Sequence, residues 1–246
     1  MQRKGRIMTS ILLILIKLLS AVLAAVFAGN GAVYLFNHMP AQWFCDYGQT
    51  PAEEMMNPYT QRVKSYPWKY IFTMLFVVVN IKMVMDDWQF AICGLCVIWL
   101  LLEMAIADVK YRIVPDQLVI LLTVCALGFI PYVGGWKPCL LGAAIGFGVM
   151  GATALLGKIA YKRDTLGGGD IKLFTSLGLI MGPWGMITTL VLTTLISSGH
   201  LVYLLAAKKI KRTDTVPMVP YIAAAATIYL VFLWGRAEVF FDIFSV

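Results

Sequence analysis

Charged residues are scarce in this chain of 246 residues, of which only 13% are Asp, Glu, Lys or Arg. Apolar and aromatic residues make up 60% of the sequence. A soluble domain cannot keep so much apolar surface in contact with water, and disordered or fibrous chains have a very different composition. The scarcity of charge therefore excludes these classes and predicts a membrane protein.

Cysteine and histidine are also rare, with five Cys and two His residues in the whole chain. Five cysteines are too few for a disulfide framework. Cys93 and Cys96 have the spacing of a metal-binding pair, but they lie in an apolar run with no second pair nearby, so we expect them to pack as apolar residues. His38 and His200 are far apart in the sequence. The residue pattern therefore predicts neither a metal site nor a cofactor.

Long apolar runs fill most of the chain, and a transmembrane helix needs about 20 such residues. The sixth run is short and is separated from the seventh by Gly182-Pro183. We expect the first run to be a retained span, because about 26 apolar residues is long for a signal-peptide core. These runs predict an all-α polytopic membrane protein with about eight transmembrane helices, and seven is the alternative. The runs are 9–36, 67–85, 88–107, 117–134, 139–161, 171–181, 184–207 and 217–235.

Basic residues outnumber acidic ones by 20 to 13, which gives a net charge of +7. In a polytopic membrane protein such residues mark cytoplasmic loops, so we favour this explanation over nucleic-acid binding. Twelve of them fall in alternate loops, which should then face the cytoplasm and place both chain ends outside. The cluster of Arg3, Lys4 and Arg6 argues for the opposite orientation of the N-terminus. The twelve are Arg62, Lys64, Lys110, Arg112, Lys158, Lys162, Arg163, Lys172, Lys208, Lys209, Lys211 and Arg212.

Two aspartates lie at helix ends on the predicted cytoplasmic side. Asp108 ends the third run, and Asp170 opens the sixth, directly after three glycines. Because both lie at the same membrane boundary, we expect them to meet. Two adjacent carboxyl groups do not both ionise readily, so one holds a proton while the other takes a proton from water. The activated water is then the nucleophile, and this chemistry predicts hydrolysis of a peptide bond without a covalent intermediate.

Each of these acids also has a structural interpretation. Asp170 lies where the N-cap of a helix is expected, and Asp108 can pair with Lys110 or Arg112. The glycines form either a plain turn or a surface where a substrate backbone comes close to the carboxylate. Asp116 lies at the start of a helix, which favours a structural role, with support of the aspartate pair as the alternative.

Glu103 is an acid inside the third run, five residues before Asp108. A charge at such a depth costs about 2.5–3.5 kcal/mol on insertion scales, so we expect Glu103 to face protein or a wet cavity. It is then either a neighbour of the site or bonded to a buried partner such as Asn80. The alternative function is a small ion- or proton-coupled transporter that uses Glu103, Asp108 and Asp170 as its path. A proton path needs acids at staggered depths, whereas hydrolysis needs two acids at one depth.

The order and spacing of these motifs resemble those of a known family, the GxGD-type type IV prepilin peptidases. The resemblance rests on Asp108 followed by Pro115, and on Gly167-x-Gly169-Asp170-Ile-Lys-Leu at the start of a later helix. The segment 216–221, Val-Pro-Met-Val-Pro-Tyr, resembles the entry to the family's last helix. The segment 29–40 resembles the end of the first helix in longer members.

This resemblance implies an intramembrane aspartic endopeptidase that removes the basic leader of type IV prepilins or pseudopilins. It places the active site at the cytoplasmic face of the bacterial inner membrane. Prepilins and the lipid bilayer are then its partners, nucleic acid is not, and the oligomeric state stays open. Asp108 and Asp170 match the two catalytic positions. The residues at matching substrate-binding or supporting positions are Gly167, Gly169, Asp116 and Lys172.

The sequence departs from the longer members in its first cytoplasmic loop. Those members carry two Cys-x-x-Cys pairs suited to zinc, whereas this loop holds only Cys45, so four soft ligands cannot be assembled. Family members often also methylate the new N-terminus, and this chain has no glycine-rich nucleotide turn that would assign that activity. We therefore divide the chain into 1–66, a first helix and loop without the zinc-type pairs, and 67–246, a seven-helix catalytic core.

Overall fold

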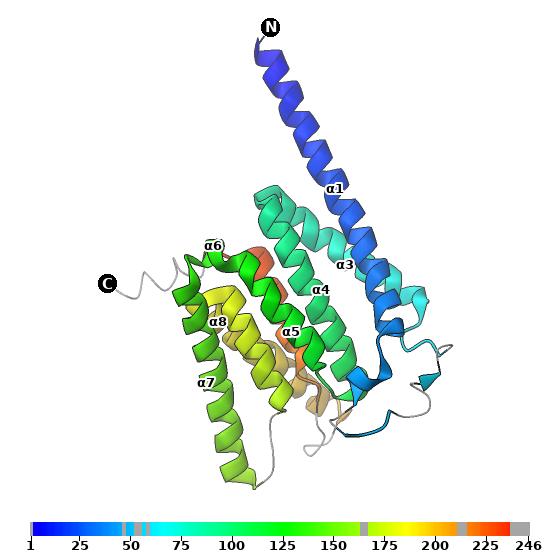
Figure 1. Cartoon of the computed structure of the whole chain (residues 1–246), viewed down its shortest axis with the longest axis vertical. Coiled ribbons are helices and arrows are strands. Elements are labelled where there is room, and N and C mark those ends of the chain that lie inside the picture. The colour runs from blue at the N-terminus through cyan, green and yellow to red at the C-terminus, as the bar shows by residue number, and fades with distance from the viewer. Residues whose placement is uncertain are drawn as a thin grey trace. The chain divides into compact units, whose positions relative to one another are not determined.

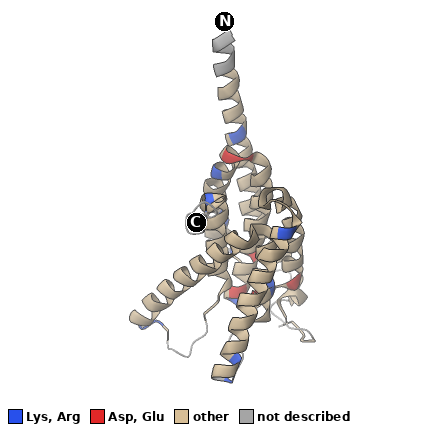
Figure 2. Ribbon diagram, turned by 90° about the vertical axis from the view of Figure 1, so that its left-hand side faces the viewer, with Lys and Arg blue, Asp and Glu red and all other residues tan. Residues whose placement is uncertain are grey.

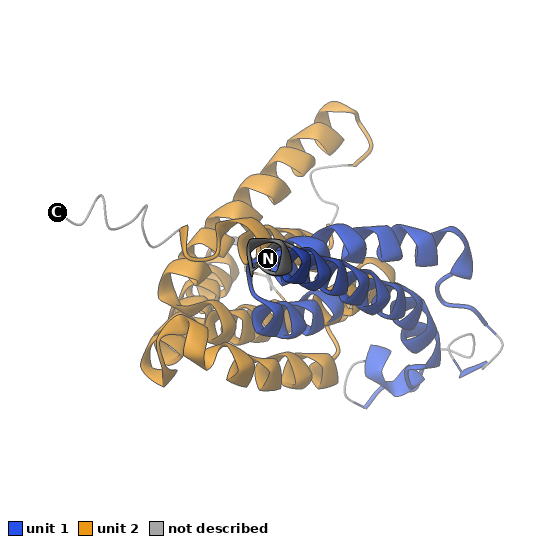
Figure 3. Cartoon of the chain, turned by 90° about the horizontal axis from the view of Figure 1, so that it is seen from above, with its two compact units in different colours: residues 1–99 blue, residues 100–246 orange. Residues whose placement is uncertain are grey.

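The computed structural model of the chain describes residues 2–45, 48–51, 56–57, 60–162, 167–210 and 216–236. Within these ranges every regular element is a helix and no strand is present, which confirms the all-α prediction (Figure 1). The chain forms two compact units, Met1–Trp99 and Leu100–Val246 (Figure 3). The predicted functional division at residue 66 is a different boundary and stays a prediction.

Unit 1 contains α1 (Gln2–His38), the short 3₁₀ helix η1 (Ala41–Phe44), α3 (Ser65–Asp86) and the first half of α4 (Trp88–Tyr111). The helices α1 and α3 pack closely where a Cβ at Gly29 would collide with the backbone of Thr73. Buried polar side chains from α3 and α4 then bond to α1, because in an apolar interior such groups need partners. Asn80 donates to the carbonyl of Ala21 at 2.9 Å, and the indole N–H of Trp99 donates to that of Ala28 at 3.2 Å.

Unit 2 contains the second half of α4 and the remaining helices of the chain. The long helices α7 and α8 are packed through glycine, since a Cβ at Gly178 would overlap the backbone of Gly142. Small residues four apart on both helices, such as Gly142 and Gly146, allow backbones to approach in this way. The elements are α5 (Asp116–Cys125), η2 (Ala126–Phe129), α6 (Ile130–Val133), α7 (Trp136–Tyr161), α8 (Gly168–Ala206), α9 (Val219–Ile228) and the π-helical segment η3 (Tyr229–Leu233).

The element α8 is broken where the sequence predicts an interruption between two apolar runs. Gly182 has φ 66° and ψ −175°, a conformation that favours glycine, and Pro183 follows it without an N–H to donate. A straight helix of 39 residues would be about 58 Å long, nearly twice the hydrocarbon thickness. The break instead allows the second half of α8 to return.

The contacts of the two halves of α8 show this reversal. Just after the break, Gly185 lies against the ring of Tyr229 at the end of α9. Near the end of α8, His200 bonds to the hydroxyl group of Tyr221 at the start of α9. The second half of α8 therefore runs antiparallel to α9, whereas the first half runs antiparallel to α7.

Six elements among the described residues are long and apolar enough to cross a membrane, so the predicted number of eight is not confirmed. The difference arises at α8, which contains the sixth and seventh runs, and at the last run, whose helix Val219–Leu233 is shorter than a span. The six are Met8–His38, Ser65–Asp86, Trp88–Tyr111, Asp116–Val133, Trp136–Ala160 and Gly168–Ala206.

The surfaces of these helices agree with a membrane environment. Large apolar side chains are exposed along them, as at Leu19 and Phe27 of α1, which are 63% and 77% exposed. Charged residues are sparse along the spans and gather near helix ends (Figure 2). Three of the basic residues used to predict the orientation, Arg163, Lys211 and Arg212, lie outside the described residues.

Candidate active site

Asp108 lies in the last turn of α4 and is buried, with 8% of its surface exposed. Its Oδ2 accepts a hydrogen bond of 2.9 Å from the backbone N–H of Val219. Val219 is the first residue of α9, where unpaired N–H groups favour a negative charge. The start of α9 therefore binds the carboxylate of Asp108 and fixes its position.

Asp170 is the third residue of α8, and its side chain is half-buried. The N-cap residue of this helix is Gly167, so the prediction that Asp170 occupies the N-cap position is wrong. Its carboxylate still interacts with the backbone N–H of Gly167. The first turn is nevertheless a favourable place for an acid because of the helix dipole. The side chain of Asp170 lies close enough to that of Asp108 for their charges to interact.

Three further polar residues, Arg112, Tyr221 and His200, are connected to Asp108 through charge and hydrogen bonding. Arg112 follows the last residue of α4 with φ 59°, and its charge acts on both Asp108 and Tyr221. The Tyr221 hydroxyl lies 2.6 Å from Nδ1 of His200, near the far end of α8. The first and last turns of α8 therefore both lie at the end of unit 2 that contains Asp108. The roles of Val219, Tyr221 and His200 were not predicted. The proline-bearing segment 216–221 contains Val219 and Tyr221, and its resemblance to the entry of the family's last helix was the only indication that this region matters.

The glycines before Asp170 differ in what they contact. A Cβ at Gly169 would lie 2.8 Å from the Cβ of Val114, in the loop that follows α4, so only glycine fits there without a shift. At Gly167 a Cβ would make ordinary contact with Asp170, and at Gly168 it would meet nothing within 4 Å. The absence of a side chain at Gly169 therefore lets the start of α8, which carries Asp170, pack against the loop that follows α4. Gly167 and Gly168 leave the surface beside Asp170 open.

Asp116 and Lys172 form an ion pair that ties α5 to the first turn of α8. The Nζ of Lys172 lies 2.8 and 2.9 Å from the two carboxylate oxygens of Asp116. Further along both helices, the hydroxyl groups of Thr123 and Ser176 are 2.8 Å apart. Both contacts hold α8 in register with α5, so the two predicted supporting residues lie together beside the segment that carries Asp170.

Glu103 is fully buried in α4, and neither of its oxygens has a hydrogen-bond partner among the described residues. Asn80, which we considered as its partner, instead donates to the carbonyl of Ala21. Five residues along a helix correspond to a rotation of about 140°, so Glu103 does not share a helix face with Asp108. Glu103 therefore stands apart from the hydrogen bonds that position the aspartate pair.

A sequence profile of the type IV leader peptidase family matches residues 95–204. The matched range contains Asp108, Asp116 and the glycines before Asp170. Over this range, a little under half of its length, the chain is similar to the type IV leader peptidase family. The relationship agrees with the resemblance that the paired aspartate motifs indicate.

Several curated relatives carry the name prepilin leader peptidase/N-methyltransferase. The relative from Xanthomonas campestris pv. campestris is 28% identical over 175 residues, which are 70% of this chain and 59% of the relative. The one from Stutzerimonas stutzeri is 33% identical over 157 residues, or 61% and 51% of the two chains. The matched part thus covers less than two thirds of these relatives. No solved structure matches this chain.

Possible metal ligands are dispersed among the described residues. In the parts that the structure describes, no three His, Cys, Asp or Glu residues come together as ligands for a metal ion. Cys45 is a free thiol whose Sγ lies 3.5 Å from the carbonyl of Ala41. Cys93 and Cys96 are also free, and Cys96 is exposed on α4.

The ion pair between α5 and α8 leads to a stability prediction. We expect Asp116→Asn and Lys172→Gln to lower the stability of the detergent-purified chain slightly, since the Lys172 side chain is 55% exposed and solvent weakens the attraction. A double-mutant cycle on thermal unfolding should give a coupling of about 0.5–1 kcal/mol. Single effects that add to within about 0.3 kcal/mol would show that the pair contributes no attraction of its own.

Proposed function

We propose that this chain is an aspartic endopeptidase that cleaves the basic leader from type IV prepilins or pseudopilins. The observation that supports this proposal most directly is the placement of Asp108 and Asp170. They come from separate helices, and their charged groups lie within interaction range at one end of unit 2. The match of residues 95–204 to the type IV leader peptidase family supports the substrate class.

The proposed reaction uses the pair as base and acid. Asp108 accepts the N–H of Val219 and lies beside Arg112, so we assign it the role of the carboxylate that removes a proton from water. The resulting hydroxide attacks the scissile carbonyl carbon, while protonated Asp170 donates its proton to the carbonyl oxygen. The C–N bond then breaks as the nitrogen takes the proton held by Asp108, and a hydroxyl group of the tetrahedral intermediate returns a proton to Asp170. No covalent intermediate with the protein is needed.

The proposal places this end of unit 2 at the cytoplasmic face of the inner membrane. Basic residues in the last turns of α4 and α7, Lys110 and Lys158, support this orientation. They would repel a basic leader, so we assign its attraction to acidic groups and to the anionic membrane surface. The open surface at Gly167 and Gly168 gives an extended peptide access to Asp170.

The geometry favours hydrolysis over the alternative of an ion or proton path. A path needs acids in sequence across the membrane. Asp108 and Asp170 instead lie at one end of unit 2, and Glu103 makes no hydrogen bond with any described residue. N-terminal methylation is named for the relatives, and we assign no residue of this chain to it.

The test is an in vitro cleavage assay with the full chain in detergent micelles. The substrate is a prepilin with a basic leader, a glycine and an apolar segment, and mass spectrometry detects the products. We expect release of the leader, at a rate that EDTA does not change. Failure to cut any of a panel of prepilins and pseudopilins would contradict the proposal, and strong inhibition by EDTA would require a metal in the mechanism.

The close contact between Gly169 and Val114 can be tested in the same assay with a matched pair of glycine variants. In Gly169→Ala the new Cβ would lie 2.8 Å from Val114, so Asp170 or the loop after α4 must move. Because a displacement of about 1 Å can reduce a rate by about 10²-fold, we expect cleavage to fall by roughly 10-fold to 100-fold. Gly168→Ala, whose Cβ meets open space, is the control and should be much less affected.

If both glycine variants lost activity equally, backbone flexibility rather than packing against Val114 would explain the motif. If neither lost activity, the close approach would have no role in positioning Asp170.

A further inference from the structure

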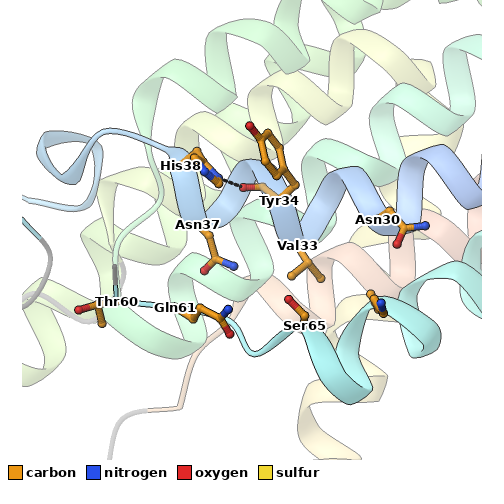
Figure 4. Close-up of a pocket in the computed structure, with 9 residues that line it drawn as sticks. Asn30, Val33, Tyr34, Asn37, His38, Thr60, Gln61 and Ser65 are labelled. Carbon is orange, nitrogen blue, oxygen red and sulfur yellow. Dashed lines mark hydrogen bonds between the residues drawn. The ribbon is translucent and has the colours of Figure 1, made fainter. Parts of the chain in front are cut away.

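Unit 1 contains a polar cavity of about 500 Å³ at the end of α1 (Figure 4). Cavities of this size accommodate small ligands or the head group of a lipid. Its walls come from the last turns of α1, the segment before α3 and the first turns of α3. The polar residues that matter below are Asn30, Asn37, Thr60, Gln61, Ser65 and Lys69.

The wall formed by the segment before α3 is held in place by hydrogen bonds. The side chain of Asn37 donates to the carbonyl of Val63 at 2.9 Å and accepts its N–H at 2.8 Å. Arg62 donates to the carbonyl of Met39 at 2.6 Å and lies over the ring of Phe44. These contacts hold the segment against the end of α1, so this wall of the cavity has a defined position.

The charge and hydrogen-bonding groups of the cavity favour an anionic ligand. Lys69 is the charged side chain of the lining, and no carboxylate of the described residues lines the cavity with it. The hydroxyl groups of Thr60 and Ser65 and the amide of Gln61 can each donate a hydrogen bond. A phosphate group accepts several such bonds and pairs with a lysine. The Nζ of Lys69 lies 4.9 Å from the centroid of the Tyr70 ring, and it would repel a basic peptide.

The position of the cavity favours a lipid as the source of the phosphate. It lies where the span Met8–His38 ends and the span Ser65–Asp86 begins, which is the level of the lipid head groups. Leu23 and Phe27 precede Asn30 by seven and three residues and are 51% and 77% exposed. These spacings place them on the side of α1 that bears Asn30, toward the interior of the bilayer, where acyl chains can lie against them.

We propose that this cavity binds the phosphate group of an anionic glycerophospholipid, represented by phosphatidylglycerol. Lys69 pairs with the phosphate, Thr60, Gln61 and Ser65 donate hydrogen bonds to it, and the acyl chains lie along α1.

Native mass spectrometry of the full chain in a neutral detergent can test this binding. The probes are phosphatidylglycerol and phosphatidylcholine with identical acyl chains, and the chain is compared with its Lys69→Gln variant. We expect phosphatidylglycerol to bind at least about tenfold more weakly to the variant, equivalent to 1.4 kcal/mol. Ser65→Ala, which retains the charge, should produce a smaller loss in the same direction.

Lys64→Gln is the matched control, because Lys64 is exposed beside the cavity but does not line it. Equal losses in Lys64→Gln and Lys69→Gln would indicate general surface attraction and overturn the proposal. Equal binding of phosphatidylcholine and phosphatidylglycerol would also overturn it. Displacement of the lipid by millimolar inorganic phosphate would assign the cavity to a soluble phosphate compound instead. Thermal unfolding of each variant checks that the fold is intact.

Discussion

Asp108→Asn and Asp170→Asn should each reduce prepilin cleavage by about 10²–10⁴-fold, the range that proton transfer by a positioned group contributes. Asparagine has nearly the shape of aspartate but neither removes a proton from water nor donates one to the carbonyl oxygen. In the proposed reaction both transfers are necessary, so either change alone should abolish most of the activity. The measurement is the initial rate of leader release by the purified chain.

Asp86→Asn serves as the control for these aspartate variants. Asp86 is an exposed acid at the end of α3, where it pairs with Lys82, and its loss should leave cleavage nearly unchanged. Thermal unfolding must show that the Asp108 and Asp170 variants remain folded. An undiminished rate in either one would rule out the aspartyl mechanism and favour the alternative function of a transporter.

Gly142→Ala and Gly178→Ala should cause the largest losses of stability. A methyl group at either position would overlap the backbone of the other helix, and a backbone cannot rotate away as a side chain can. Overpacking costs about 1–3 kcal/mol, and we expect values near the upper end, with a lowered unfolding temperature in detergent. Because α7 and α8 would separate, Asp170 should also lose its position and cleavage should fall.

Gly148→Ala provides the comparison on the same helix, since a Cβ there meets no atom within 4 Å. It should leave the unfolding temperature unchanged or raise it slightly, because alanine favours a helix over glycine. If Gly142→Ala were as stable as Gly148→Ala, the close contact between α7 and α8 would not contribute to the fold.

The sequence predicted the features of the fold that depend on local pattern. Long apolar runs predicted the helices, and Gly182-Pro183 predicted the break in α8 because both residues act on their own backbone. The number of spans was less certain, since hydropathy does not say whether two runs belong to one element. The reversal of direction within α8 depends on how its second half packs against α9, and no local sequence pattern predicts this packing.

The candidate site was predictable to a similar extent. The paired motifs identified Asp108 and Asp170, and the structure brings their charges together. The bond between Asp108 and Val219 joins residues 111 positions apart, so neither sequence neighbourhood contains its partner. Asp116 and Lys172 were each recognised, but the pairing between them depends on how α5 and α8 pack.

The hydrogen bond from Val219 to Asp108 bears on how much of the chain any working fragment must retain. The family profile ends at residue 204, whereas this amide donor lies fifteen residues beyond it. A protein trimmed to the profile would keep both acids and lose the backbone group that anchors one of them. Expression trials and chimeric enzymes should therefore extend at least through Leu233, where the last helical segment ends.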